Sequence, residues 1–121
     1  MTESLPPPAR RALLERAREL FNGGEYWAAH EALETVWRSI LVEQPEAARV
    51  WQGLIQGAAA LLHGRRGNRH GVEVVGRAAL DKLSGPNRTD VEFDVTTFRA
   101  QLARALAGTG DPPRLEFRTD A

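Results

Sequence analysis

Residues 50–64, VWQGLIQGAAALLHG, decide the fold, because these fifteen consecutive residues carry no formal charge when His63 is counted as neutral. A helix that spans a bilayer needs about 20 apolar residues, and Gln52, Gln56 and His63 interrupt the apolar character of this one. The other residues are apolar or small around most of the helix surface, as in a helix enclosed by other helices. The stretch therefore predicts a central helix over about residues 46–64.

Four further helices are predicted around this one from the spacing of apolar residues. Asn68 and Asp94 are side chains that commonly cap helix N-termini, and each precedes a stretch with helical periodicity. Gly23, Gly24 and Gly67 are suited to end helices. The predicted helices cover about residues 8–22, 25–41, 69–83 and 95–106.

No stretch shows the alternating pattern of a strand, so we predict an all-α protein, a compact bundle of about five helices around a buried central helix. A length of 121 residues suits a single helical domain over residues 1–121. Residues 1–7 and 108–121 contain several prolines and continue no helical pattern. We expect them to be extended or partly disordered, with Leu115 and Phe117 docking on the helices.

The composition limits where the chain works and what it binds. It contains 16 basic residues, 16 acidic residues and no cysteine. Balanced charge gives no general field for nucleic acid or an anionic membrane. The absence of cysteine excludes disulfides and thiolate metal sites, and it fits the cytoplasm. Since residues 1–12 lack the apolar run of a signal peptide, we expect a cytoplasmic protein without a membrane segment.

The helix predicted over residues 25–41 carries ionisable residues among aromatic ones, in the stretch EYWAAHEALETVW of residues 25–37. His30 and Glu34 are one turn apart and fall at the edge of its apolar stripe, whereas Glu31 lies further round the helix. A buried carboxylate without hydrogen-bond partners is strongly destabilising. The sequence therefore predicts that Glu34 has partners.

The central helix offers such partners, because Gln52, Gln56 and His63 fall on one polar strip of its surface. Amide groups and imidazole nitrogens can donate hydrogen bonds to a carboxylate. We therefore predict that this strip faces the polar edge of the neighbouring helix, so that His30 and Glu34 join it in one polar cluster.

Two functions remain open for the cluster, and the first is that of a metal-dependent enzyme. A divalent metal ion held by two histidines and a glutamate lowers the pKa of a bound water and makes it a nucleophile. The motif HEALE of residues 30–34 is weaker than the zinc signature that has histidine at its last position. The predicted site residues are Glu31 and Glu34 for catalysis, Trp27 and Gln56 for binding a small-molecule substrate, and His30, Glu34 and His63 for the metal.

In the second function, the cluster is a structural hydrogen-bond network that sets how two helices pack. The chain is then a non-catalytic helical adaptor or dimeric scaffold. Helices rich in tryptophan leave room for a homodimer, because large aromatic side chains dominate many interfaces.

Residues 64–70, GRRGNRH, gather three arginines and His70 between two predicted helices. The arginines can complement the negative C-terminal end of the central helix, with His70 solvated at the first turn of the next one. Binding of phosphate or a nucleotide is a third hypothesis, in which backbone donors at the start of the following helix assist. The balanced charge of the chain argues against a nucleic-acid partner.

Three ordered segments, FNGGEYWAAHEALETVW, WQGLIQGAAALLH and GNRHG, together resemble a bacterial and archaeal family known as domain of unknown function 309. The resemblance covers about residues 10–85 and implies a small multihelical bundle around one buried central helix. Family members have been described as metal-dependent hydrolases, so the resemblance also implies a divalent metal. The family pattern usually has glutamate where this chain has Ala28, which points away from the His30 edge. The motif positions are Tyr26, Trp27, His30, Glu31, Glu34, Trp37, Gln56, His63, Asn68 and Gly71.

Overall fold

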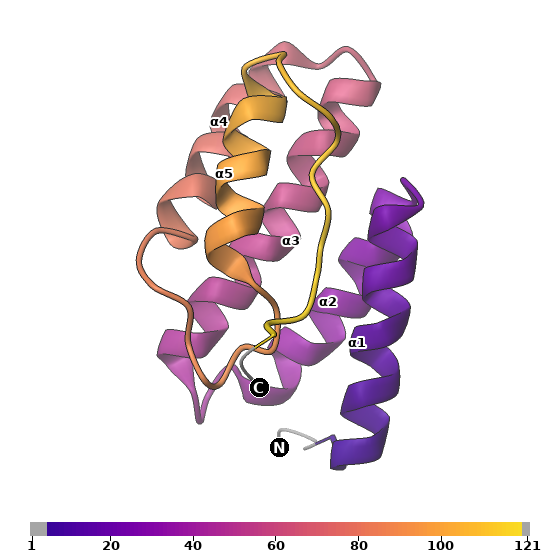
Figure 1. Ribbon diagram of the computed structural model, residues 1–121, viewed down its shortest axis with the longest axis vertical. Coiled ribbons are helices and arrows are strands. Elements are labelled where there is room, and N and C mark those ends of the chain that lie inside the picture. The colour runs from indigo at the N-terminus through magenta and orange to yellow at the C-terminus, as the bar shows by residue number, and fades with distance from the viewer. Residues whose placement is uncertain (1–4, 120–121) are drawn as a thin grey trace.

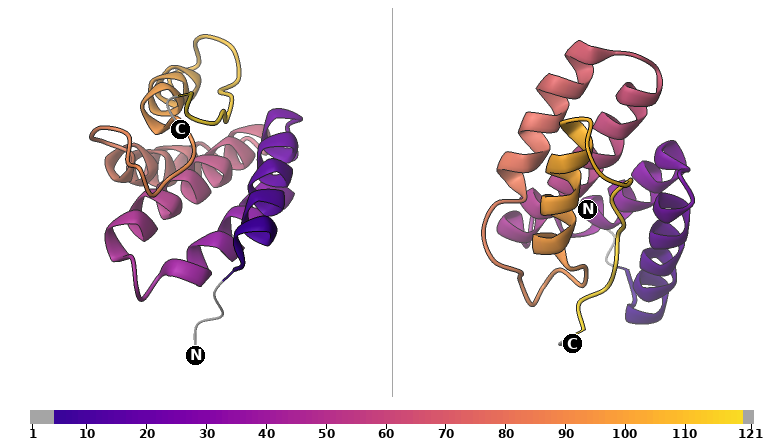
Figure 2. Two further views of the ribbon diagram at one scale, coloured as in Figure 1. Left: turned by 60° about the horizontal axis from the view of Figure 1, so that its bottom comes forward. Right: turned by 45° about the horizontal axis from the view of Figure 1, so that its top comes forward.

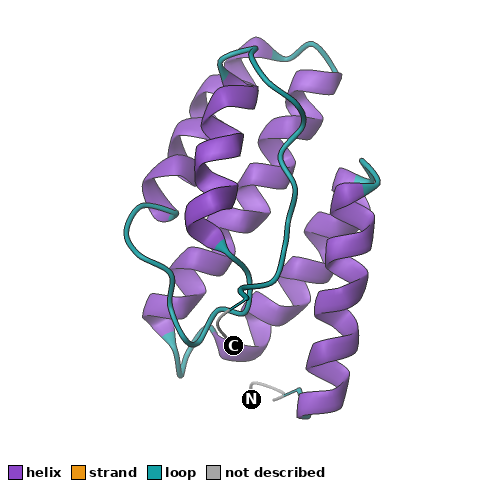
Figure 3. Cartoon of the chain, viewed as in Figure 1, coloured by secondary structure: helices purple, strands orange, loops and turns teal. Residues whose placement is uncertain are grey.

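The computed structural model describes residues 5–119, and five helices account for most of this part of the chain (Figure 1). The predicted all-α class is confirmed, because the described residues form no strand (Figure 3) and only an isolated bridge joins Phe93 to Phe117. Residues 1–4 and 120–121, at the predicted extended ends, lie outside the described part. The helices are α1 (Pro7–Asn22), α2 (Tyr26–Ile40), α3 (Pro45–Arg65), α4 (Arg69–Lys82) and α5 (Val95–Leu106).

Helix α3 is the central helix, as its uncharged sequence predicts. Helices α2 and α4 pack along it, α1 packs on α2, and α5 rests against α3 and α4. Figure 2 shows α5 and the segment after it on one face of the layer that α2, α3 and α4 form. No described helix, α3 included, has the length and apolar character needed to cross a membrane.

Two glycines let neighbouring helices approach α3 closely. A Cβ atom added at Gly53 would lie 2.9 Å from Cγ and Cδ2 of Leu83, which follows α4. A Cβ atom at Gly57 would lie 3.3 Å from Cδ2 of Leu102 on α5. Close-packed interiors leave no room for extra atoms at such distances, so the small residues of α3 are what allow it to be enclosed.

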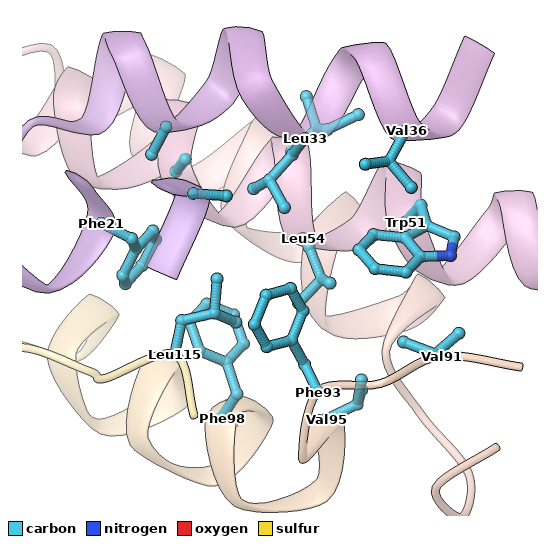
Figure 4. Packing of buried hydrophobic residues seen from close by; sticks show 14 of the residues in the cluster. Phe21, Leu33, Val36, Trp51, Leu54, Val91, Phe93, Val95, Phe98 and Leu115 are labelled. Atoms are coloured by element: carbon cyan, nitrogen blue, oxygen red, sulfur yellow. The ribbon is translucent and has the colours of Figure 1, made fainter. Parts of the chain in front are cut away.

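The core also contains residues from segments that form no helix (Figure 4). Val91 and Phe93 lie between α4 and α5, and Leu115 follows α5; all three are fully buried. The ring of Phe93 packs edge-on against Trp51 of α3, with centroids 5.8 Å apart. The predicted docking of Leu115 and Phe117 is confirmed, since Phe117 stacks on Phe93 at a centroid distance of 4.9 Å.

Asn68 and Asp94 cap the N-termini of α4 and α5, as predicted. The Oδ1 atom of Asn68 accepts a hydrogen bond from the backbone N–H of Gly71 at 2.9 Å. The Oδ1 atom of Asp94 accepts one from the backbone N–H of Thr97 at 3.1 Å and another from Nδ2 of Asn87 at 3.0 Å. Each cap thereby satisfies a backbone donor that the first turn of a helix leaves free.

These hydrogen bonds make the stabilising effect of Asp94 depend on pH. The bond from Asn87, and then those from Thr97, hold the pKa of the Asp94 carboxyl below the 3.8 of an unperturbed aspartate. Because the folded-state pKa is the lower one, this stabilisation is present above the unfolded-state pKa and is lost as the pH falls through the folded-state value. We expect Asp94→Ala to lower the free energy of unfolding by about 1–2 kcal/mol near neutral pH, and by less in acid.

Urea unfolding at neutral and acidic pH measures both effects. Asp94→Asn is the matched control, because asparagine caps helices about as well as aspartate but does not titrate. The Asp94→Asn variant should keep most of the free energy of unfolding at neutral pH and lose the part of its pH dependence that comes from Asp94. An equal loss for Asp94→Ala at both pH values would contradict the charged cap.

Candidate functional site

Trp27 and His30 lie against each other on the exposed edge of α2. Their rings stack with centroids 5.1 Å apart and an interplanar angle of 25°. Trp27 is 57% exposed, whereas the side chain of His30 is only 23% exposed. Residues three apart share one face of a helix, so α2 alone brings this pair together.

Glu34 is paired, as the sequence predicts for a carboxylate at the edge of the core, but its partners are on its own helix. Its Oε2 atom lies 3.4 Å from Nε2 of His30, and its Oε1 atom accepts a hydrogen bond from Nη2 of Arg38. His30 and Arg38 stand four residues before and after Glu34, the spacing at which helical side chains meet. The result is a continuous row of three ionisable groups along α2.

The hydrogen bonds predicted between Glu34 and the polar strip of α3 are absent from residues 5–119. Gln52, Gln56 and His63 are each half-buried on α3. Arg38 and His30 occupy both oxygens of Glu34, and reaching them requires no contact between helices. The local pairing therefore takes the place of the predicted one.

His63 belongs to the corner between α3 and α4. Its Nδ1 atom lies 3.1 Å from Nδ2 of Asn68. Since Oδ1 of Asn68 accepts from Gly71, its amide nitrogen donates to His63, and Nδ1 of His63 is the acceptor. A Cβ atom at Gly71 would lie 2.7 Å from Cγ of His63, so Gly71 makes space for this ring. His63 thus helps to hold the cap of α4.

The donor groups gathered on α2 do not make a three-ligand metal site. Among residues 5–119 no three His, Cys, Asp or Glu side chains come together in a way that could hold a metal ion. His30 and Glu34 are a pair, His63 bonds to Asn68, and Glu31 is exposed. Nδ1 of His30 and Oε1 of Gln56 are buried without a hydrogen-bond partner. The catalytic, substrate-binding and metal-binding roles of these residues stay predictions.

A stripe of exposed and partly buried side chains runs along α2 to Leu41 and continues the Trp27–His30 pair. Its ends are apolar, with Trp27 57% exposed and Leu41 40% exposed. Its residues follow one another at alternating intervals of three and four, a spacing that is visible in the sequence. We call it the α2 stripe, and it consists of Trp27, His30, Glu34, Trp37 and Leu41.

Comparison of the sequence with known proteins identifies a family. An uncharacterized protein from Aquifex aeolicus (strain VF5) is 36% identical over 109 residues, which cover 87% of this chain and 32% of that relative. The chain therefore spans about a third of the relative's length. No solved structure matches. The sequence model of the family described as "Domain of unknown function (DUF309)" matches residues 14–75, just over half of the chain and all of α2 and α3. The chain belongs to this DUF309 family.

Proposed function

We propose that the chain is a non-catalytic helical scaffold that forms a homodimer through the α2 stripe. The observation that carries the proposal is the exposure of large apolar side chains at both ends of the stripe, 57% for Trp27 and 40% for Leu41. Exposed tryptophan is costly in water and is enriched among the residues that dominate interfaces.

The spacing of the α2 stripe suits a second copy of α2. Intervals of three and four residues are those of the seam between two packed helices. In an antiparallel pair with its two-fold axis near Glu34, Trp27 lies against Leu41 of the partner subunit, and the reverse contact follows by symmetry. The same patch therefore serves on both protomers.

The polar middle of the stripe is compatible with this packing. The two Glu34 side chains come close to the axis, and like charges there would repel. Each Glu34 already has Arg38 and His30 as partners on its own helix, so the carboxylate enters the interface compensated. Polar residues at such seams commonly fix register and partner number, and this is the role we assign to the row.

Sedimentation equilibrium of the full chain tests the proposal. We expect a dimer whose dissociation constant rises by about 30-fold or more in Trp27→Glu, because the change buries a charge where an aromatic anchor stood. Val74→Glu is the matched control, since Val74 on α4 is also 56% exposed but lies outside the stripe. A chain that is monomeric at all accessible concentrations, or equal effects of the two variants, would overturn the dimer.

Metal-dependent hydrolysis is the competing function, and the unpaired buried atoms of His30 and Gln56 favour it. The residues present supply two ligands on α2, fewer than the three or four that protein zinc sites use, so they do not fit a resident metal. Elemental analysis after mild purification, with melting curves in added zinc, manganese and iron, separates the two functions. We expect no bound metal and no shift. One equivalent of metal that disappears in His30→Gln would support the competing function instead.

A further inference from the structure

One end of the bundle carries arginines that have no acidic partner. This is the end where α3 and α5 finish and α4 begins (Figure 1). Within residues 5–119, Arg66, Arg69 and Arg104 make no side-chain hydrogen bond or ion pair. Several arginines elsewhere have acidic partners, as in Arg10–Glu92, Arg49–Asp81 and Arg88–Asp90, although Arg16 and Arg77 have none in the described part of the chain. The chain has a net charge of zero, but this end gathers three arginines without an ion-pair partner among residues 5–119.

Arg65, also at this end, is held in place by neutral groups. Its Nη1 atom donates to the carbonyl oxygen of Gly24 at 2.6 Å. Its guanidinium carbon lies 4.8 Å from the centroid of the Tyr26 ring. Neither contact neutralises the cation, and both restrict its rotamers. Arg65 is therefore a positioned donor with its remaining N–H groups free for a ligand.

A hollow of about 380 Å³ opens beside Arg65, between the turn that joins α1 to α2 and the segment after α5. This volume is within the range of small-molecule sites. Arg114 lines the opposite wall together with Asp111 and Pro112. The same three residues separate it from a second hollow of similar size, which Arg104 lines. Three arginines thus border a depression made of two adjoining hollows that share one wall.

We propose that this depression, the Arg65 hollow, binds the phosphate groups of a small organic phosphate. Guanidinium groups form paired, charge-assisted hydrogen bonds with phosphate oxygens. Arg65 and Arg114 hold one phosphate between the two walls, and Arg104 meets a second phosphate in the adjoining hollow. The Nη2 atom of Arg114 also lies 3.3 Å from Oε1 of Glu116, so Arg114 breaks or shares this ion pair when the ligand binds.

Asp111 selects among anions in this site. It lines both hollows and makes no hydrogen bond or ion pair within the described residues. Its carboxylate repels an anion that fills the whole depression. An anion that contacts the arginines on either side of Asp111 is attracted more strongly. A diphosphate has that shape. The site shares no residue with the α2 stripe, so the dimer and the ligand site can be tested independently.

Isothermal titration calorimetry of the full chain with inorganic pyrophosphate and with ATP, at low ionic strength, tests the proposal. We expect saturable binding that weakens about tenfold or more in Arg65→Gln and in Arg104→Gln, the loss typical of a charged hydrogen bond. Asp111→Asn should strengthen binding. Arg16→Gln is the matched control, because Arg16 is an exposed arginine of α1 without a side-chain partner in residues 5–119. It should bind like the parent chain.

Comparing the affinities for the two ligands separates recognition of the phosphates from recognition of the organic part. Equal affinity for pyrophosphate and ATP assigns recognition to the phosphates alone, and tighter binding of ATP adds contacts to its organic part. Arg104 makes no side-chain hydrogen bond or ion pair within the described residues, so Arg104→Gln keeps the test valid if Arg65→Gln unfolds. No saturation by either compound, equal weakening in Arg16→Gln, or binding of single-stranded RNA without binding of pyrophosphate would overturn the small-ligand site.

Discussion

Replacing Leu115 by alanine is expected to lower the free energy of unfolding by about 2–5 kcal/mol, the range for truncating a buried leucine. Leu115 is fully buried although it lies outside any helix. Its backbone is fixed on α1, since its N–H donates to Oδ1 of Asn22 at 2.7 Å and its carbonyl accepts from Nδ2 of Asn22 at 3.0 Å. The segment cannot move to fill the cavity without losing these bonds.

Chemical unfolding monitored by tryptophan fluorescence measures this effect. Arg114→Ala is the neighbouring control, because Arg114 is exposed and surface substitutions usually change stability by less than about 0.5 kcal/mol. If the two variants were equally stable, the segment after α5 would contribute little to the stability of the helical bundle. A large loss in Leu115→Ala alone makes it part of the core.

Gly53→Ala is expected to destabilise the chain by about 1–3 kcal/mol, the usual effect of overfilling a packed interior. The new Cβ atom would lie 2.9 Å from two carbons of Leu83 and 3.0 Å from Cβ of Lys82. Leu83 is itself fully buried, so it has no free space to move into. The packing of α4 against α3 must loosen to admit the methyl group.

Gly64→Ala makes the same chemical change on the same helix and is expected to have the opposite sign. Its Cβ atom would lie 3.6 Å from Cγ2 of Val72, an ordinary contact, and alanine favours the helix over glycine by about 0.5 kcal/mol. Thermal unfolding of both variants gives the comparison. If Gly53→Ala also raised the melting temperature, close approach of α4 would not be what requires glycine there.

The fold could be predicted from the sequence because its decisive features are local. The uncharged stretch of α3 and the caps Asn68 and Asp94 act within a few residues of where they stand. The Trp27–His30 stack and the His30–Glu34 pair also follow from helical spacing alone. Features of this kind do not depend on how the neighbouring helices pack.

The rest of the site depends on how helices are rotated against each other, which a helical wheel does not contain. The wheel gathers Gln52, Gln56 and His63 on one strip, but it does not say which neighbour the strip meets. His63 in fact bonds to Asn68 at the α3–α4 corner. The Arg65 hollow could not be predicted from the sequence for a further reason, because residues 21–26, Arg65 and residues 111–114, which line it, are distant from one another in the sequence.

The burial of Leu115 and Phe117 also bears on how the protein is made. Until the segment after α5 has left the ribosome, Phe93 lacks the ring that stacks on it. A nascent chain at that stage shows an unfinished apolar surface to chaperones and proteases. Because Leu115 and Phe117 follow all five helices in the sequence, these core contacts close only after their segment has emerged from the exit tunnel.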